Sequence, residues 1–162
     1  MGRFIFVTLG LLVVAFSLRG SRADCPSRWS SFDKYCYKVF NESKNWDDAE
    51  RFCMEQGTGG HLASVRSFEE GNFVGKLTFD SLSNKPDYVW IGFRGHSQGQ
   101  QCCTPWSDGS SIIYENWHAE QYRRCLALER WSEFRIWRNY NCNITLPFIC
   151  KFLAEPEDPA PE

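Results

Sequence analysis

Signals for metal and nucleic-acid binding are scarce in this 162-residue sequence. It has three histidines, and none of its eight cysteines forms a Cys-x-x-Cys pair, so the paired thiolates of a structural zinc site are missing. Acidic residues outnumber basic ones by 20 to 18, which argues against a protein that binds nucleic acid through a basic face. The only long apolar run is Phe4–Phe16, whose thirteen residues fall short of the roughly 20 that a membrane-spanning helix needs.

That apolar run has instead the form of a secretory leader. Arg3 precedes it, and Ser21-Arg22-Ala23 places small residues at the two positions that signal peptidase reads. We therefore predict a signal peptide over residues 1–23 and a secreted mature chain, with a membrane anchor as the alternative. The mature chain has 139 residues, a length typical of one domain, and its net charge is 15 − 20 = −5 once the three basic residues of the leader are removed.

All eight cysteines lie in the predicted mature chain. In a secreted domain of this size they indicate a disulfide framework rather than metal ligands. Cys25 and Cys36 flank a short aromatic-rich hairpin, so a local bridge between them is the simplest interpretation, whereas spacing alone leaves the other pairings open. Cys102 and Cys103 are adjacent, and adjacent cysteines rarely bridge each other because the ring that they would close is strained.

Apolar periodicity predicts an α+β domain built around one central strand. Tyr88–Phe93 is an aromatic and β-branched run typical of a buried strand. We expect one helix after Asn45, and a second after Ser67, which stands three residues before Glu70 in the form of a capping box. Further strands are expected at His61–Val65, Cys125–Leu128, Arg135–Trp137 and Phe148–Phe152, and residues 153–162 form an acidic, proline-rich tail that we expect to be disordered.

One catalytic motif occurs in the loop after the central strand. Gly95-His96-Ser97-Gln98-Gly99 matches the nucleophile elbow of serine hydrolases, with Asp108 and His118 downstream in the order of a catalytic triad. The elbow requires a helix directly after its serine. Residues 100–105 carry two cysteines and a proline and have no helical period, so we predict that the protein is not an enzyme.

Many spaced residues follow one known family in order. They cover residues 24–152 and comprise Cys25-Pro26, Trp29, Cys36-Tyr37, the helix Trp46–Cys53, His61-Leu62-Ala63-Ser64, Trp90-Ile91-Gly92, Trp106-Ser107-Asp108-Gly109, Cys125, Trp137, Cys142 and Pro147-Phe148-Ile149-Cys150-Lys151. In these residues the chain resembles the C-type lectin-like domain, a fold of two helices with antiparallel sheets. The leader and the segment from Cys102 to Gly109 resemble more narrowly the snake-venom members, the snaclecs, and among them the α-type chains.

The resemblance implies a disulfide pattern and a mode of assembly. The implied intrachain bridges are Cys25–Cys36, Cys53–Cys150 and Cys125–Cys142. In snaclecs the long loop after the Trp-Ile-Gly strand is swapped between two related subunits, and a cysteine four residues before Trp106 joins them covalently; Cys102 stands at that position. Cys103 departs from the family pattern and could link a second dimer, substitute for Cys102, or carry a small capping thiol.

Calcium-dependent sugar binding, a property of lectins in this family, is not expected here. The family motif Glu-Pro-Asn or Gln-Pro-Asp is replaced by residues 118–122, His-Ala-Glu-Gln-Tyr, and Trp-Asn-Asp is replaced by Trp137-Arg138-Asn139. At a separate structural calcium site of some snaclecs, Ser64 and Glu70 match two ligands, but Arg66 and Asn143 stand where acids are expected. A cation in place of an acid repels calcium, so we predict that neither position binds the ion and that the protein needs no cofactor.

The remaining features indicate a glycoprotein that binds another protein. Asn41 and Asn143 begin N-glycosylation sequons. Arginine and aromatic residues, which are favoured at interfaces, cluster late in the chain, where we expect the partner-binding residues Arg123, Arg124, Arg130, Trp131, Arg135 and Arg138; an ordinary solvated face is the alternative.

The resemblance to snaclecs implies a target class as well. It implies a venom toxin chain that is disulfide-linked to a related β-type chain, binds a platelet receptor and impairs haemostasis. Glycoprotein Ib is the favoured receptor, ahead of glycoprotein VI or a collagen-binding integrin. An anticoagulant that binds clotting factor IX or X is the first alternative, and a calcium-dependent galactose lectin is the second.

Overall fold

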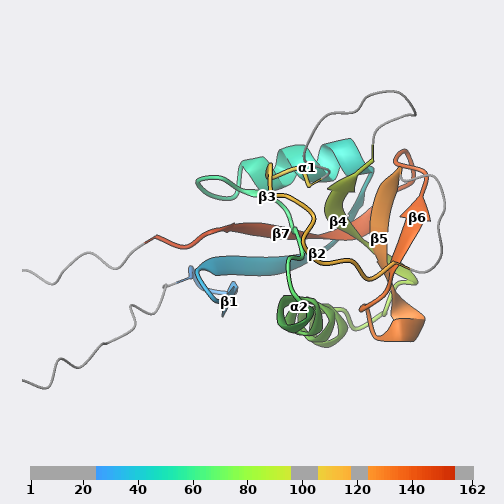
Figure 1. The fold of residues 1–162 in the computed structure, drawn as a ribbon, viewed down its shortest axis with the longest axis horizontal. Coiled ribbons are helices and arrows are strands. Elements are labelled where there is room, and N and C mark those ends of the chain that lie inside the picture. The colour runs from blue at the N-terminus through green and yellow to red at the C-terminus, as the bar shows by residue number, and fades with distance from the viewer. Residues whose placement is uncertain (1–24, 96–105, 118–123, 156–162) are drawn as a thin grey trace, which may run out of the picture.

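The computed structural model describes residues 25–95, 106–117 and 124–155, in which two helices pack against a twisted sheet (Figure 1). A short 3-10 helix, η1, follows β5. In chain order the elements are β1 (Ser30–Phe32), β2 (Tyr35–Lys44), α1 (Trp46–Met54), β3 (His61–Leu62), α2 (Phe68–Ser81), β4 (Tyr88–Arg94), β5 (Cys125–Glu129), η1 (Arg130–Ser132), β6 (Trp137–Tyr140) and β7 (Leu146–Leu153). None of the helices in the described ranges is long and apolar enough to cross a membrane.

The sheet has the strand order β1-β2-β7-β4-β5-β6, with β3 pairing to β7 beside it. The last strand, β7, enters between the N-terminal strand β2 and the central strand β4. It runs antiparallel to β2 but is parallel to β4, where Trp90 faces Phe148. The sheet is therefore mixed, whereas the sequence led us to expect antiparallel sheets. The parallel pairing of β7 with β4 follows from inserting the C-terminal strand between two strands that themselves run in opposite directions.

Both helices begin at the residues that the sequence predicts. The Asn45 side chain accepts a hydrogen bond from the backbone N–H of Asp48 at 2.9 Å, and the Ser67 side chain accepts one from that of Glu70 at 3.1 Å. Each cap satisfies a backbone donor that the first turn of a helix leaves free. Helix α1 then buries Trp46, whose indole N–H donates to the carbonyl oxygen of Ile91 in β4 at 2.9 Å.

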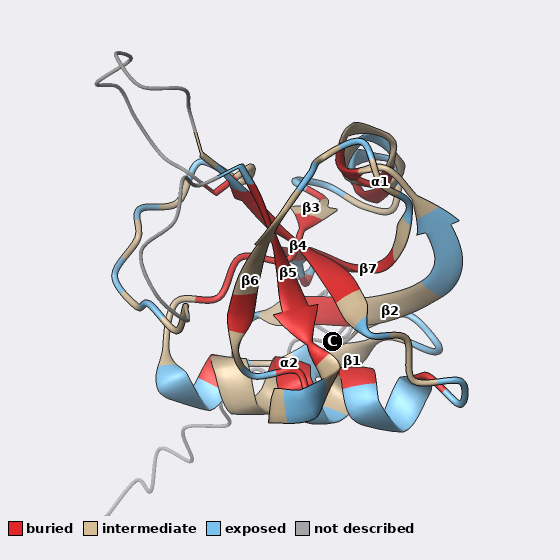
Figure 2. Ribbon diagram, turned by 90° about the vertical axis from the view of Figure 1, so that its right-hand side faces the viewer, coloured by how far each residue is buried: buried red, intermediate tan, exposed pale blue. Residues whose placement is uncertain are grey.

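The central strand β4 separates two apolar cores. Figure 2 shows buried strands of the sheet between α1 on one side and α2 on the other. Because neighbouring side chains of a strand point to opposite faces, Val89, Ile91 and Phe93 enter the core beneath α2, while Trp90 enters the core beneath α1. All four residues are fully buried. The prediction of a buried central strand at Tyr88–Phe93 is confirmed, and β4 extends one residue further, to Arg94.

Several expected strand boundaries differ from the structure, and β3, for example, ends at Leu62 rather than at Val65. The strand expected at Arg135–Trp137 begins only at Trp137, because Glu133 and Phe134 adopt left-handed backbone angles, with φ values of 55° and 60°, in the turn before it. At the other end, Leu153 still belongs to β7, and the backbone N–H of the buried Ala154 donates to the carbonyl oxygen of Lys34 at 3.0 Å. The ordered chain therefore continues past the domain boundary expected at residue 152, and residues 156–162 of the expected tail lie outside the described residues.

Three disulfides join the described part of the chain: Cys25–Cys36, Cys53–Cys150 and Cys125–Cys142. These are the pairs that the family resemblance implies. Cys53–Cys150 ties α1 to β7 across 97 residues of sequence, whereas Cys25–Cys36 spans only 11. In the chain-entropy model a disulfide that closes a longer loop restricts the unfolded chain more strongly.

We expect the replacement of both Cys53 and Cys150 by alanine to lower the free energy of unfolding by about 4 to 5 kcal/mol, and the same replacement of Cys25 and Cys36 to lower it by about 3 kcal/mol. Urea unfolding monitored by tryptophan fluorescence measures both values. Equal losses for the two pairs would contradict the view that the long-range bridge makes the larger contribution.

Candidate functional site

A buried ion pair connects β7 to α2. The Lys151 ammonium lies 2.7 Å from Oε1 of Glu70, and the two side chains are only 3% and 7% exposed. Lys151 also donates to Oγ of Ser64 at 3.0 Å and to the Ser64 carbonyl oxygen at 3.2 Å. An ammonium carries three donors, and the surrounding residues provide three oxygen acceptors for them.

The carboxylate of Glu70 is held from several sides. The Tyr37 hydroxyl donates to Oε1, and the backbone N–H of Arg66 donates to Oε2 at 2.7 Å. Burial and the neighbouring Glu70 charge raise the pKa of Tyr37 far above its ordinary value, so the phenol remains a donor. A complete capping box would turn Glu70 back to the N–H of Ser67. Here the serine half of the box forms, while the carboxylate binds Lys151, Tyr37 and Arg66.

Asp108 extends this network from the coil after Trp106. Its carboxylate accepts hydrogen bonds from the hydroxyl of Ser64 and from the backbone N–H of Ser110 at 2.9 Å and its hydroxyl at 2.6 Å. Burial raises the pKa of Asp108, but these hydrogen bonds and the Lys151 charge outweigh that effect and lower it below its ordinary value. For Lys151, burial lowers the pKa, and the charge of Glu70 opposes that change.

This network occupies the position at which the sequence suggested two structural calcium ligands. Ser64 and Glu70 do lie together, and their oxygens are of the kind that calcium prefers. The group between them is, however, the ammonium of Lys151, whose positive charge does not fit beside a divalent cation. The sequence analysis placed a further expected calcium-ligand position at Asn143. In the structure Asn143 lies in the turn before β7, where its backbone N–H donates to the Asn141 side chain. Lys151 follows Cys150 directly in an otherwise apolar strand, and a lysine at such a position was the sequence signal that a buried cation occupies this site.

Two of the residues that stand in place of a sugar-binding calcium site, Arg138 and Asn139, are engaged in protein contacts, whereas residues 118–122 lie outside the described residues. The Arg138 side chain pairs with the nearly buried Glu129 carboxylate at 2.9 Å. The Asn139 side chain accepts a hydrogen bond from the backbone N–H of Arg124 at 3.3 Å. Both contacts join neighbouring strands of the sheet, so these side chains stabilise β5 and β6.

Three of the arginines that we expected to contact a partner form ion pairs with acids of the same chain. Arg130 pairs with Asp87 at 3.0 Å, and Arg135 pairs with Glu133 at 3.1 Å. Together with the Arg138–Glu129 pair, these contacts balance three of the expected positive charges with acids. Arg124 is exposed at the start of β5, while Arg123 lies outside the described residues. The cluster is thus a mixed-charge face rather than a strongly basic one.

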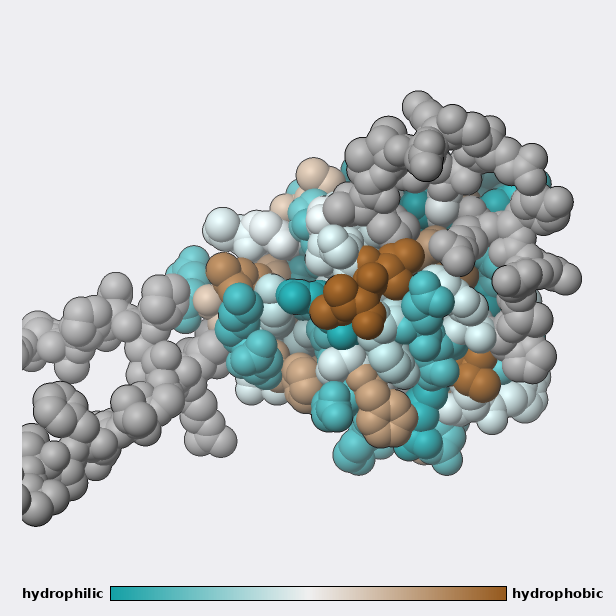
Figure 3. Space-filling view, viewed as in Figure 1, coloured by the Kyte–Doolittle hydropathy of each residue, from teal (hydrophilic) through white to brown (hydrophobic). Residues whose placement is uncertain are grey.

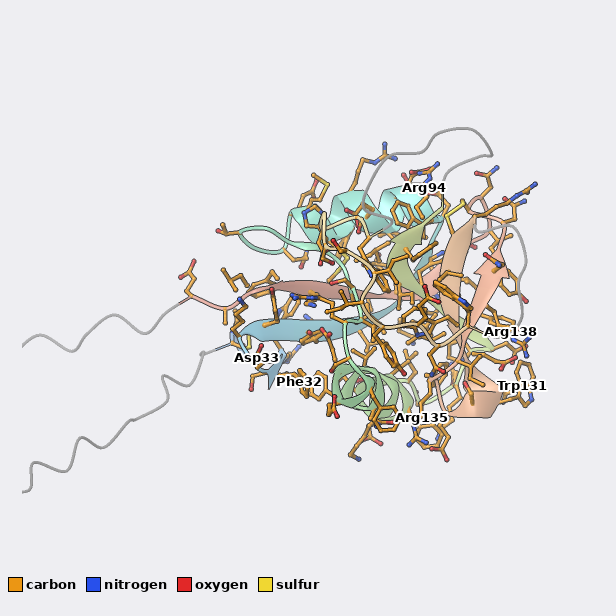
Figure 4. The ribbon with its side chains drawn as sticks, in the orientation of Figure 1. Phe32, Asp33, Arg94, Trp131, Arg135 and Arg138 are labelled. Atoms are coloured by element: carbon orange, nitrogen blue, oxygen red, sulfur yellow. A yellow bond between two sulfur atoms is a disulfide. The ribbon has the colours of Figure 1, made fainter. Side chains whose placement is uncertain are left out.

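An exposed aromatic group at the end of the sheet is the clearest contact feature of this cluster. Trp131 in η1 is 64% exposed, and its ring lies 6.0 Å from that of Tyr88 and 4.8 Å from the Arg130 guanidinium (Figure 4). Tyr88 in turn packs 4.3 Å from Tyr140. Burial and a hydrogen bond with Tyr88 raise the pKa of Tyr140 to about 12. We call Trp131, Tyr88, Tyr140 and Arg130 the η1 surface.

A second exposed apolar side chain lies on the coil between Trp106 and Trp117. Ile113 is 68% exposed, and Figure 3 shows apolar side chains gathered near the centre of one face of the molecule, surrounded by hydrophilic ones.

Several predicted site residues cannot be placed in this arrangement. Ser97, Cys102, Cys103, His118 and Arg123 lie outside the described residues. The structure therefore does not test the nucleophile-elbow motif, which we expect not to be catalytic, and the interchain bridge remains a prediction.

Comparisons with known proteins agree with this fold. Residues 42–152 match the family described as Lectin C-type domain, and the fold is that of a C-type lectin-like domain. The chain is 69% identical to one snaclec chain of Philodryas olfersii over 98% of its own length and 99% of that protein. It is 49% identical to the α chain of snaclec EMS16 of Echis multisquamatus over 95% and 99%. The chain therefore belongs to the snaclecs, the snake-venom C-type lectin-like proteins, and is of the α type.

Solved structures give the same relationship. The crystal structure of EMS16, described as an antagonist of the collagen receptor integrin α2β1, aligns with a TM-score of 0.63 at 47% identity and covers 81% of this chain and 100% of its own. Rhodocetin in complex with the integrin α2 A domain aligns with a TM-score of 0.63 at 44% identity, with the same coverage.

The lowered pKa of Asp108 makes a pH-dependent prediction. A carboxylate with a folded-state pKa below its ordinary value of 3.8 contributes stability above that value, and this contribution is lost as the pH falls through the lowered pKa. We expect Asp108→Asn to lower the free energy of unfolding by about 1 to 2 kcal/mol near pH 7 and by much less near pH 2. Urea unfolding at the two pH values measures this. Asp80→Asn, in the exposed Lys76–Asp80 pair, is the control and should have little effect. The same loss for Asp108→Asn at both pH values would contradict the assignment.

Proposed function

We propose that the protein is a secreted venom toxin chain that binds a platelet surface receptor by protein–protein recognition, without calcium, and thereby impairs haemostasis. The observation that carries this proposal is similarity to snaclecs over nearly the whole chain, including two relatives of solved structure that are named for the α2 integrin. The resemblance to snaclecs makes glycoprotein Ib the first receptor to test, and the two structural relatives named for the α2 integrin make its A domain the second.

Calcium independence follows from the contacts of two cationic side chains. Lys151 fills the space between Ser64 and Glu70, and Arg138 is held by Glu129. Among the residues that the structure describes, neither position offers a set of uncommitted oxygens to a divalent ion. These contacts weigh against the galactose-lectin alternative, in which calcium would hold the sugar, and leave protein surfaces as the means of recognition.

The η1 surface is the contact region that we propose for the receptor. Tryptophan, tyrosine and arginine make the largest contributions at protein interfaces, and Trp131 presents its ring to solvent beside Tyr88 and Arg130. Arg124 lies before Cys125, at the end of β5 opposite to Trp131, and Arg123 lies outside the described residues, so both remain expected partner-binding residues separate from the η1 surface. Arg135 and Arg138 are assigned a supporting role, because their guanidinium groups are paired with Glu133 and Glu129.

We further propose that the chain works as part of a covalent dimer. Cys102 would form an interchain disulfide with a related β-type chain through a swapped loop, and Cys103 would provide a second link. The relatives include two different snaclec chains of one species, Philodryas olfersii, each named as one of two subunits. A multimer linked through both cysteines would cluster several receptors, whereas a single dimer would tend to block one.

A glycan placed on the η1 surface gives a specific test of receptor binding. Arg130→Asn creates a sequon with Ser132 and directs a bulky glycan beside Trp131, while Arg130→Gln removes the same charge without a glycan. The native disulfide-linked protein and both variants, co-expressed with the partner chain that mass mapping identifies, are passed over immobilised glycoprotein Ib ectodomain and α2 A domain in EGTA. We expect one receptor to bind the native protein, Arg130→Asn to abolish this binding and Arg130→Gln to weaken it about tenfold or less.

Two outcomes would contradict the proposal. Failure to bind either receptor, together with binding to factor IX or X in calcium, would favour the anticoagulant alternative. Equal receptor binding by Arg130→Asn, with its glycan confirmed by mass, would place the contact region elsewhere.

A further inference from the structure

Two glycosylation sequons converge at one end of the sheet. The pairing of β2 with β7 shifts between Phe40↔Phe148 and Lys44↔Leu146, so four residue steps on β2 are matched by two on β7. The extra residues bulge out of the ladder. The bulged stretch holds Asn41, Glu42 and Ser43, three residues opposite the single Pro147 of β7; they form the first sequon and are all exposed.

The second sequon occupies the turn that leads into β7. Asn143 and Thr145 are exposed, and the turn is held by the Cys125–Cys142 disulfide and by a hydrogen bond from the N–H of Trp46 to the carbonyl of Cys142 at 3.0 Å. The register pair Lys44↔Leu146 then brings the end of each sequon next to the other.

The hydroxyl residues of the two sequons line a single open groove. It encloses about 510 Å³ and runs along the outer face of α1, between Ser43 and Thr145. Its other lining residues are mostly polar or charged: Lys44, Asn45, Asp48, Arg51, Phe52 and Glu55. A hydrated polysaccharide suits such a surface better than the apolar core of a protein interface would.

We propose that N-linked glycans on Asn41 and Asn143 together cover this groove and make it a face that neither the receptor nor the partner chain contacts. The proposal rests on the proposed secretion, because the sugar donor, a lipid diphosphate-linked oligosaccharide, is found in the secretory pathway. Each asparagine Nδ2 forms a bond to C1 of the first sugar, the bond from C1 to the diphosphate oxygen breaks, and the amide loses one proton. In Figures 1 and 4, α1 lies along the upper side of the molecule and the labelled Trp131 lies at its lower right, so the exposed Trp131 ring and the groove along α1 lie on different sides.

Glycan occupancy and groove accessibility can be measured separately from receptor binding. The native disulfide-linked protein is compared with Asn41→Gln, Asn143→Gln and the double variant, and with Ser43→Ala and Thr145→Ala, which remove the sequons while keeping the asparagines. Intact mass before and after treatment with peptide N-glycosidase counts the glycans. Acylation by an N-hydroxysuccinimide ester, followed by peptide mapping, reports the rate at which Lys44 in the groove reacts, with Lys76 of α2 as the control lysine.

We expect one glycan to be lost with each single change. The labelling rate of Lys44 should rise at least about threefold in the double variant while that of Lys76 is unchanged, and receptor affinity should stay within about twofold. An absent glycan at either asparagine, an unchanged Lys44 rate, or a loss of affinity beyond about tenfold in both sets of variants would overturn the proposal. If the native protein binds no receptor, the mass and labelling results still decide whether the groove is covered. Failure of the proposed receptor binding can therefore be distinguished from failure of the glycan proposal.

Discussion

The buried ion pair between Lys151 and Glu70 is the interaction on which the arrangement of α2, β2 and β7 depends. Removing an ammonium and a carboxylate from water is costly unless each finds partners. Here Ser64 completes the coordination of Lys151, and Tyr37 and the Arg66 N–H complete that of Glu70. Loss of one member would leave a buried charge without its partner, at a cost of about 3 to 5 kcal/mol. The Lys151 ammonium thus bridges the oxygens of Ser64 and Glu70, as a bound metal ion can do among such ligands.

This constraint determines what kind of recognition the fold can support. Carboxylates near the two expected calcium positions are committed to internal ion pairs. Lys151 of β7 pairs with Glu70 of α2, and Arg138 of β6 pairs with Glu129 of β5. Recognition is then left to exposed side chains on a framework fixed by three disulfides. The η1 surface carries aromatic rings and a guanidinium, whereas the groove along α1 is polar and bordered by two sequons. The η1 surface and the groove along α1 therefore differ in chemistry in the way that a receptor-binding surface and a glycan-covered surface would.

Local signals predicted the framework well, because each is decided by a few neighbouring residues. Asn45 and Ser67 cap the helices as expected, and Tyr88–Phe93 is the buried central strand. Contacts across long stretches of sequence were harder to predict. Nothing near Lys151 in the sequence identifies Glu70 as its partner, 81 residues away, and the pairing of Arg130 with Asp87 likewise joins residues that are distant in the sequence. The convergence of the two sequons likewise depends on a bulge in β2 that no local pattern reveals.

The most direct measurement is the thermal unfolding of the disulfide-linked protein and its Lys151→Glu variant, each in EGTA and in calcium. The account predicts a wild-type midpoint that exceeds the variant's in EGTA, because the variant buries two carboxylates without a cation. It also predicts a rise of the variant's midpoint in calcium well beyond any rise of the wild type, because ligands stabilise the state that they bind. Any response of the partner chain is common to both proteins. A variant as stable as the wild type in EGTA, or a wild-type midpoint that rises in calcium as much as the variant's, would contradict the assignment of Lys151 as the internal cation.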